Sequence, residues 1–140
     1  MNASEGGGLA GGNGTGASIT DSYAMASVPG TGSGGLIGND NSSNATVTNS
    51  YSTGAVGINN NGGFACAAIR STTSKDYWDT DTSGTTFGLC EDGNIPEVTG
   101  LTTEQLQSGL PSGFSSKVWA EDPNINGEFP YLINNPPEQK

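Results

Sequence analysis

The sequence contains one short acidic motif of a kind that binds calcium. Residues 79–84 read DTDTSG, which matches the D-x-D-x-S-G opening of a calcium loop. Asp79, Asp81 and Ser83 would supply oxygen ligands, and in an extended segment the two carboxylates would point to the same side. A helix–loop–helix calcium site also needs a Glu at its twelfth position, where this chain has Cys90. The motif therefore leaves two alternatives, a calcium site and a solvated acidic turn.

Few side chains in this sequence could carry out catalysis. The chain has no histidine, which excludes Ser-His-Asp and Cys-His arrangements. Arg70 with Asp76, Asp79 and Asp81 is the only cluster that could imitate the groups of a calcium-dependent polysaccharide lyase. Arg70 could equally pair with one of these acids and serve structure alone. We expect no enzymatic activity.

Cys66 and Cys90 are the only cysteines. They are too few for a four-cysteine zinc site, and no histidine is present to complete one. In an oxidising compartment they could form a disulfide, and otherwise they would be two buried thiols. At this spacing a disulfide would stabilise the fold by about 3 kcal/mol through loop entropy.

Two further motifs have ordinary explanations. Gly30, Gly32 and Gly35 satisfy G-x-G-x-x-G, but the phosphate-binding form needs a helix directly afterwards, and the residues that follow, LIGNDNSSN, do not predict one. We attribute this match to the abundance of glycine. The Asn-x-Ser/Thr sequons indicate exposed turns in an Asn/Ser/Thr-rich chain. They occur at Asn2, Asn13, Asn41 and Asn44.

The composition favours an ordered β-rich fold. Only 31% of the 140 residues are hydrophobic and 23 are glycine, yet charged residues are just 13%, fewer than a disordered chain usually carries. The formal charge of −10 argues against binding to nucleic acid or to an anionic membrane. No apolar run reaches the roughly 18–20 residues that span a bilayer, so we expect no membrane insertion. The first residues do not resemble a signal peptide, so a secreted protein would carry its signal upstream of this segment.

A repeat of about 28 residues runs through the first half of the chain. Residues 7–28 read GGLAGGNGTGASITDSYAMASV, residues 34–56 read GGLIGNDNSSNATVTNSYSTGAV, and a third copy opens at residue 62 with GGFAC. Periods of 20–50 residues are typical of stacked repeat architectures. The segment ATVTNSY alternates small or apolar with polar residues, which predicts a strand, and the glycine content argues against helix. We expect glycines at the corners, where they accept positive φ.

A single unit of this repeat cannot bury its own apolar face, whereas stacked copies can. We therefore predict an all-β fold, a short parallel β-solenoid (β-helix) of about three coils over residues 1–84. Leu9, Leu36 and Phe64 would form one inward ladder, and Ile19 with Val47 a second. Tyr23 and Tyr51 would form another ladder, facing either inward or solvent.

These motifs resemble a known repeat. GGLAG with ITDSYA, and GGLIG with VTNSYS, are similar to the GLUG repeat of large bacterial surface proteins, which include filamentous-haemagglutinin-like adhesins and some surface peptidases. The downstream stretches DYWDTDTSG, GLTTEQLQSGLPSGF, KVWAED and NGEFPYL resemble the segment that often closes such arrays. The resemblance covers nearly the whole chain, although the third copy departs from the pattern after GGFAC. It implies a secreted or bacterial cell-surface protein, with no catalytic residue to transfer.

After Gly84 the repeat is lost. We predict a C-terminal capping segment over residues 85–135 and a tail or linker over 136–140. Thr102 as N-cap, with Gln105 as its reciprocal partner, predicts a short helix inside the cap. The aromatic-rich stretch beyond it would cover the apolar end of the last coil or, alternatively, form a binding platform. Its members are Phe114, Val118, Trp119, Phe129, Pro130, Tyr131 and Leu132.

Three functions are compatible with the sequence. The first is a structural or adhesive module of a secreted bacterial surface protein, a stalk or surface that meets a glycan or protein of a host or neighbouring cell. The second is a carbohydrate-binding or carbohydrate-cleaving β-helix. The third is an extracellular filament subunit that self-associates through an open N-terminal coil. Strand faces rich in Ser and Thr can also bind ice or glycans, but we find no regular Thr-x-Thr ladder at the 28-residue period.

Overall fold

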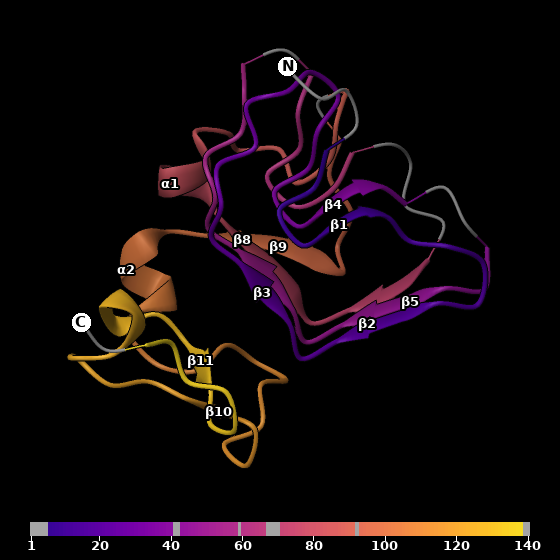
Figure 1. The fold of residues 1–140 in the computed structure, drawn as a ribbon. Coiled ribbons are helices and arrows are strands. Elements are labelled where there is room, and N and C mark those ends of the chain that lie inside the picture. Colours follow the sequence, from indigo (N-terminus) through magenta and orange to yellow (C-terminus); the bar gives the residue numbers. More distant parts are fainter. Residues whose placement is uncertain (1–5, 41–42, 59, 67–70, 92, 139–140) are drawn as a thin grey trace.

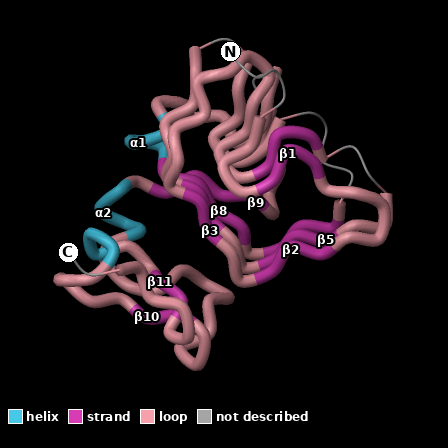
Figure 2. Tube along the Cα trace, in the orientation of Figure 1, coloured by secondary structure: helices cyan, strands magenta, loops and turns pink. Residues whose placement is uncertain are grey.

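The chain folds as a parallel β-solenoid of about three turns, as the repeat predicts. A computed structural model describes residues 6–40, 43–58, 60–66, 71–91 and 93–138. In Figure 1 the successive coils lie one behind another, with the C-terminal segment beside them. Figure 2 shows that short strands alternate with longer loops around each coil. Few helical residues occur in the described part of the chain.

Parallel sheets run along the stack. Their strands are β1 (Ala10–Gly12) with β4 (Ile37–Asn39); β2 (Ser18–Thr20) with β5 (Thr46–Thr48) and β7 (Thr72–Ser74); and β3 (Tyr23–Ala24) with β6 (Tyr51–Ser52), β8 (Asp76–Asp79) and β9 (Val98–Leu101). The other elements are the helices α1 (Thr80–Ser83) and α2 (Thr103–Leu106), the 3₁₀ turn η1 (Asn126–Glu128), and the antiparallel pair β10 (Trp119–Ala120) and β11 (Tyr131–Leu132).

The strand register confirms the aligned repeat. Ile19 pairs with Val47, and Tyr23 pairs with Tyr51. The spacing to the third rung is shorter, because Tyr51 pairs with Tyr77 and Val47 pairs with Thr73. The first two coils are therefore 28 residues apart at these strands, and the third follows after 26.

The predicted inward ladder is confirmed for Leu36 and Phe64 in the solenoid interior, but not for Leu9. Leu36 and Phe64 are fully buried in one apolar cluster with Val47 and Trp78. The Leu9 N–H donates to the Leu36 oxygen, and the Leu36 N–H donates to the Phe64 oxygen. Leu9 itself is 46% exposed, because no described coil covers the first one.

The glycine pair in each copy serves close packing. A Cβ on Gly34 would lie 2.5 Å from the Ala65 Cα, and one on Gly35 would lie 2.8 Å from the Ser52 Oγ and overlap the Gly63 main chain. Neither Gly34 nor Gly35 has positive φ. The pair is needed because the coils approach too closely for any side chain.

The corner between the second and third strand of each coil does require positive φ, but not from glycine. Asp21, Asn49 and Lys75 occupy it, with φ of 45°, 53° and 59°. The expectation of glycine at the corners is therefore wrong here, although Gly16 and Gly32 do have positive φ at other turns. Asp and Asn tolerate this region because their short polar side chains hydrogen-bond locally.

The stacking continues beyond Gly84, where the visible repeat ends. Leu89 bridges Ala65, and β9 pairs in parallel with β8 as a fourth rung. Leu89 and Val98 belong to the interior cluster and pack with Trp78, so this segment closes the C-terminal end of the interior. The chain reverses there, since Leu89 also forms an antiparallel bridge with Gly93.

The aromatic-rich stretch packs against the side of the solenoid, which corrects the predicted position at its end. Tyr23 and Tyr51 stack outward from the coils with centroids 5.3 Å apart and ring planes 6° apart. Phe114 and Trp119 cover this ladder, and the Trp119 Nε1–H donates to Asp21 in the first coil at 3.2 Å. The tyrosine ladder therefore faces neither the interior nor open solvent. In Figure 1, β10 lies on this side of the stack.

Helix α2 has the predicted start. The Thr102 hydroxyl accepts from the Gln105 N–H at 3.2 Å, and the Gln105 side chain accepts from the Thr102 N–H at 2.9 Å. This reciprocal capping box satisfies two amides at the helix start. Leu101 and Leu106 belong to the same apolar cluster, consistent with a hydrophobic staple.

Candidate functional site

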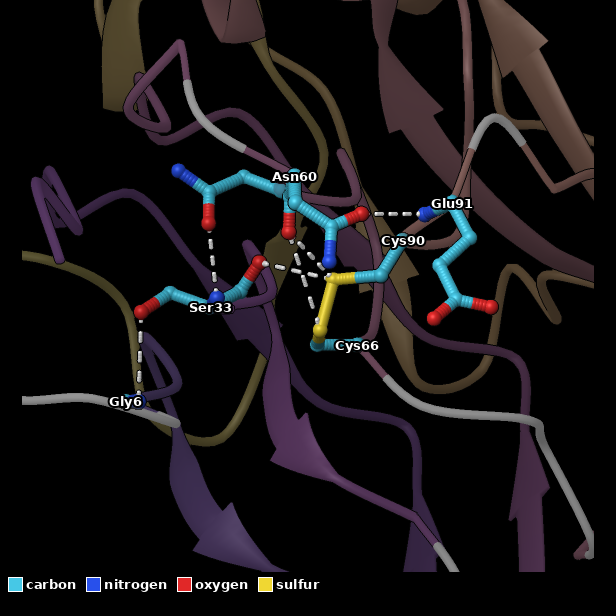
Figure 3. Close-up of a disulfide and its surroundings, with 7 residues drawn as sticks. Gly6, Ser33, Asn60, Cys66, Cys90 and Glu91 are labelled. Carbon is cyan, nitrogen blue, oxygen red and sulfur yellow. Dashed lines mark hydrogen bonds between the residues drawn. A yellow bond between two sulfur atoms is a disulfide. The ribbon is translucent and has the colours of Figure 1, made fainter. Parts of the chain in front are cut away.

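Cys66 and Cys90 form a disulfide that joins the third coil to the closing segment. Their Cα atoms are 4.7 Å apart, directly after the paired residues Ala65 and Leu89. Figure 3 shows the disulfide among turn residues of the neighbouring coils, with the Cys90 Sγ 2.8 Å from the Asn60 main-chain oxygen. Both cysteines are 8% exposed, so the bond is protected from solvent.

Replacing both cysteines with alanine should lower the free energy of unfolding by about 3 kcal/mol. The disulfide closes a loop of 24 residues, and its loss would free that loop in the unfolded chain. Urea denaturation of the double variant and the parent measures the difference. Equal unfolding midpoints would show that the disulfide does not stabilise the fold.

The DTDTSG motif forms the capped start of helix α1. The Asp79 Oδ1 accepts from the Asp81 and Thr82 N–H groups at 2.9 and 3.1 Å, and its Oδ2 accepts from the Thr103 hydroxyl at 2.7 Å. Asp81 also accepts from the Thr103 N–H, so the two carboxylates do lie together. The Ser83 hydroxyl donates to a main-chain oxygen. These hydrogen bonds explain the motif without a cation.

Calcium binding at this motif stays a prediction. Among the described residues no group of three or more His, Cys, Asp or Glu side chains could hold a metal ion. Thermal unfolding with and without calcium tests the motif directly.

The lyase-like cluster is not assembled by the described residues. Arg70 lies outside them. Asp76 is fully buried and accepts from the Ser50 N–H at 3.0 Å and the Ser74 N–H at 3.2 Å. Asp79 is likewise fully buried, and both of its oxygens accept hydrogen bonds from the protein. These two carboxylates hold main chain in place at turns.

Burial raises the pKa of Asp76 from its ordinary 3.8 to about 8, although its two backbone hydrogen bonds act in the opposite direction. The folded state then keeps a proton that the unfolded chain releases between these pH values. Stability should therefore fall as pH rises from about 4 to about 8, by roughly 1 kcal/mol per pH unit, and then level off.

Urea unfolding at pH 5.5, 6.5 and 7.5 tests this pH dependence. Asp76→Asn should be less stable at low pH, because its amide nitrogen cannot accept from a backbone N–H, and it should lose the slope. An unchanged slope in the variant would assign the pH dependence to other groups.

The remaining sequence candidates have structural roles. Gly30, Gly32 and Gly35 lie in the turn and bends that precede β4, and no helix follows them. Asn13, expected at an exposed turn, is 4% exposed and donates to the Ser71 Oγ at 3.1 Å. Asn44 is exposed with positive φ, as expected of a turn. The sequons at Asn2 and Asn41 lie outside the described residues.

The aromatic stretch does not offer an exposed platform. Phe114, Trp119 and Phe129 are all below 10% exposed, and they pack on the tyrosine ladder. The Tyr51 hydroxyl donates to the Pro130 oxygen at 2.6 Å, and burial raises the pKa of Tyr51 well above its ordinary value. These rings hold the cap to the solenoid.

One face of the solenoid presents a two-column array of hydroxyl groups. Strands β2, β5 and β7 read Ser-Ile-Thr, Thr-Val-Thr and Thr-Thr-Ser, and their middle residues point inward. The outer residues are exposed apart from the half-buried Thr48. We call this set the hydroxyl face: Ser18, Thr20, Thr46, Thr48, Thr72 and Ser74.

The hydroxyl face is regular in both directions. The backbones of neighbouring rungs are about 4.8 Å apart, and the two outward residues of one strand are about 6.6 Å apart along it. Thr46 donates to Ser18 at 3.0 Å and Thr48 to Thr20 at 3.1 Å, which orients the side chains. Such a surface can donate and accept hydrogen bonds to an extended polar ligand with a matching repeat.

The sequence analysis found no regular Thr-x-Thr ladder at the 28-residue period, and the strand register agrees: the array exists, but it does not follow that period. The first two rungs are 28 residues apart, but the third comes after only 26, and serine stands in for threonine at two of the six positions. Alignment on Tyr23, Tyr51 and Tyr77 would have revealed the third rung, because the tyrosines pair in the same coils.

Comparisons with protein-family models, with curated proteins and with solved structures gave no match to this chain. None of the helices in the described residues is long and apolar enough to cross a bilayer.

Proposed function

We propose that this chain is a structural module of a secreted bacterial surface protein, the closing unit of a β-solenoid stalk or adhesive surface. The observation that carries the proposal is the in-register stack of parallel coils, joined to its closing segment by the Cys66–Cys90 disulfide. Such a stack gives a stiff, elongated support whose loops are presented outward. Disulfides persist mainly in extracellular and periplasmic compartments.

The resemblance of the GGLAG and GGLIG copies to the GLUG repeat supports the same location. The acidic surface fits a partner other than nucleic acid, because the formal charge of −10 repels phosphate. The partner would be a glycan or protein on a host or neighbouring cell.

Antibodies raised against the folded chain test this location. Intact cells of the source organism should be labelled without permeabilisation, and mild protease treatment of the cells should remove the label. A cytoplasmic protein probed in parallel controls for lysis. Labelling that requires permeabilised cells would overturn the proposal.

The hydroxyl face favours carbohydrate binding as a second candidate function. Six hydroxyl side chains in a regular array suit an extended polysaccharide, whose own hydroxyl groups repeat along the chain. The face lies on one side of the stack, so the stalk could hold it toward a partner.

Retention on insoluble polysaccharides tests the second candidate. Thr46→Ala and Thr72→Ala should each weaken retention about fivefold, the effect of losing one hydrogen bond. Thr82→Ala, an exposed threonine on α1 outside the hydroxyl face, is the matched control. Equal retention of all variants would exclude the face as the binding surface. Inhibition of ice growth without polysaccharide retention would assign it to ice.

A further inference from the structure

The N-terminal edge of the solenoid is an exposed strand edge with apolar side chains beside it. We define it as the outward side of the first coil, which contains β1, β2 and β3. Leu9 is 46% exposed and Met25 40% exposed, and Ile19 and Tyr23 are half-buried. Unpaired strand edges with apolar surface are templates for pairing.

The hydrogen bonds between successive coils show which hydrogen bonds this edge can accept. The Leu36 oxygen accepts from the Leu9 N–H, and the Phe64 oxygen accepts from the Leu36 N–H. By the same register the Leu9 oxygen faces the N-terminal side, and no described residue donates a main-chain hydrogen bond to it. The edge is thus set to receive an N–H from a preceding residue in the same register.

At one corner, side-chain oxygens show the same direction: each accepts from a backbone N–H of the preceding coil. The Ser50 Oγ accepts from the Ser22 N–H at 3.2 Å, and Asp76 accepts from the Ser50 N–H at 3.0 Å. Ser50 also donates its hydroxyl to the Thr48 oxygen, and Ser22 donates likewise to Thr20 at 2.8 Å. Ser22 is therefore oriented like Ser50, with its lone pairs free to accept from a coil before it.

The aromatic ladder also ends open at this edge. Tyr23 stacks on Tyr51 with one face. The Trp119 ring is tilted against both, with its centroid 5.9 Å from each tyrosine centroid. Tyr23 is only half-buried, which leaves room for a further planar ring in the ladder. The cap already reaches the first coil through Trp119 and Asp21, so it can hold such a ring in place.

We propose that the N-terminal edge is a pairing site for one further coil of the same repeat. That coil would place a backbone N–H over Ser22, an aliphatic side chain over Leu9 and another over Ile19, and a ring over Tyr23. The inference names the partner surface of the stalk and so rests on the proposed function.

The end of a second copy does not match these requirements. At the C-terminal end β7 and β9 are edge strands, but beside Ala65 the chain turns back through the antiparallel Leu89–Gly93 bridge, so this end lacks a complete parallel coil. Pro96, next to Glu97 and Ser74 on that end, has no N–H to donate. A preceding coil supplied by covalent continuity therefore fits better than end-to-end stacking of copies.

The test extends the chain by one coil. A copy of residues 34–61 placed directly before Gly7 should continue the register, because residue 62 is the equivalent of Gly7 two coils later. Hydrogen exchange of the β2 and β3 amides should slow at least tenfold, and the thermal midpoint should rise. An insert of the same composition in scrambled order is the control and should give neither effect.

Ser22→Ala adds a specific readout. In the extended chain it should cost about fivefold in the unfolding equilibrium constant beyond its cost in the parent, because a hydrogen bond from the new coil is lost. Unchanged β2 and β3 exchange in the extended chain would overturn the proposal.

Sedimentation of the parent chain tests the remaining alternative, in which a second copy of the chain occupies the edge. A dimer protected at β1–β3, together with an extended chain that is no more stable, would assign the edge to a second copy and overturn the proposal. These measurements do not depend on where the protein resides. They would therefore still test the pairing site if the cell-surface labelling failed.

Discussion

Gly35→Ala is expected to destabilise the protein by at least about 3 kcal/mol, a large share of the 5–15 kcal/mol typical of a domain. Its Cβ would overlap the main chain of Gly63 in the next coil and lie 2.8 Å from the Ser52 Oγ. Relief would require two stacked coils to separate, which would disrupt their hydrogen bonds. Urea unfolding followed by circular dichroism measures the loss.

Gly11→Ala is the matched control. Gly11 lies in β1, and a Cβ there would meet nothing within 4 Å. We expect its unfolding free energy to stay within about 0.5 kcal/mol of the parent. Similar losses for both variants would mean that glycine content in general, and not close approach of the coils, explains the GG pair.

Trp119→Ala is expected to cost about 3–5 kcal/mol and to release the cap from the first coil. Trp119 is 1% exposed, stacks on Phe114 with centroids 4.5 Å apart, and donates to Asp21. Its removal leaves a cavity over the tyrosine ladder and an acceptor without its donor. Native-state hydrogen exchange should accelerate in β3, which lies under the cap.

Lys117→Ala is the control, because it changes an exposed residue of the same cap segment, two positions from Trp119. It should leave both stability and β3 exchange unchanged. Unchanged β3 exchange in Trp119→Ala would contradict a cap that reaches the first coil along the side. It would favour a cap confined to the last coil.

Local patterns made much of the fold predictable. The alternation around Ile19 and Val47 fixes which side chains face inward, and a slip of one residue would reverse every one of them. The capping box at Thr102 and Gln105 likewise depends on residues three positions apart, so the sequence predicts it directly.

The hydroxyl face could be predicted only in part. Thr46 and Thr48 repeat Ser18 and Thr20 after 28 residues, so two rungs are visible in the sequence. The third rung begins at Thr72, and the shortened loop before it hides the match. Its position becomes evident only from the strand pairing.

By itself, then, the sequence determined the coil, the spacing of its first two copies and the start of its one predicted helix, because each depends on neighbouring residues or on a repeat. The tertiary structure decided where the nonperiodic parts lie. Trp119 and Asp21 meet across 98 residues, and no local pattern states which apolar surface an aromatic segment will cover. The cap lies along the side because the outward tyrosine ladder offers it a large apolar surface, while residues 85–101 already close the end of the coil.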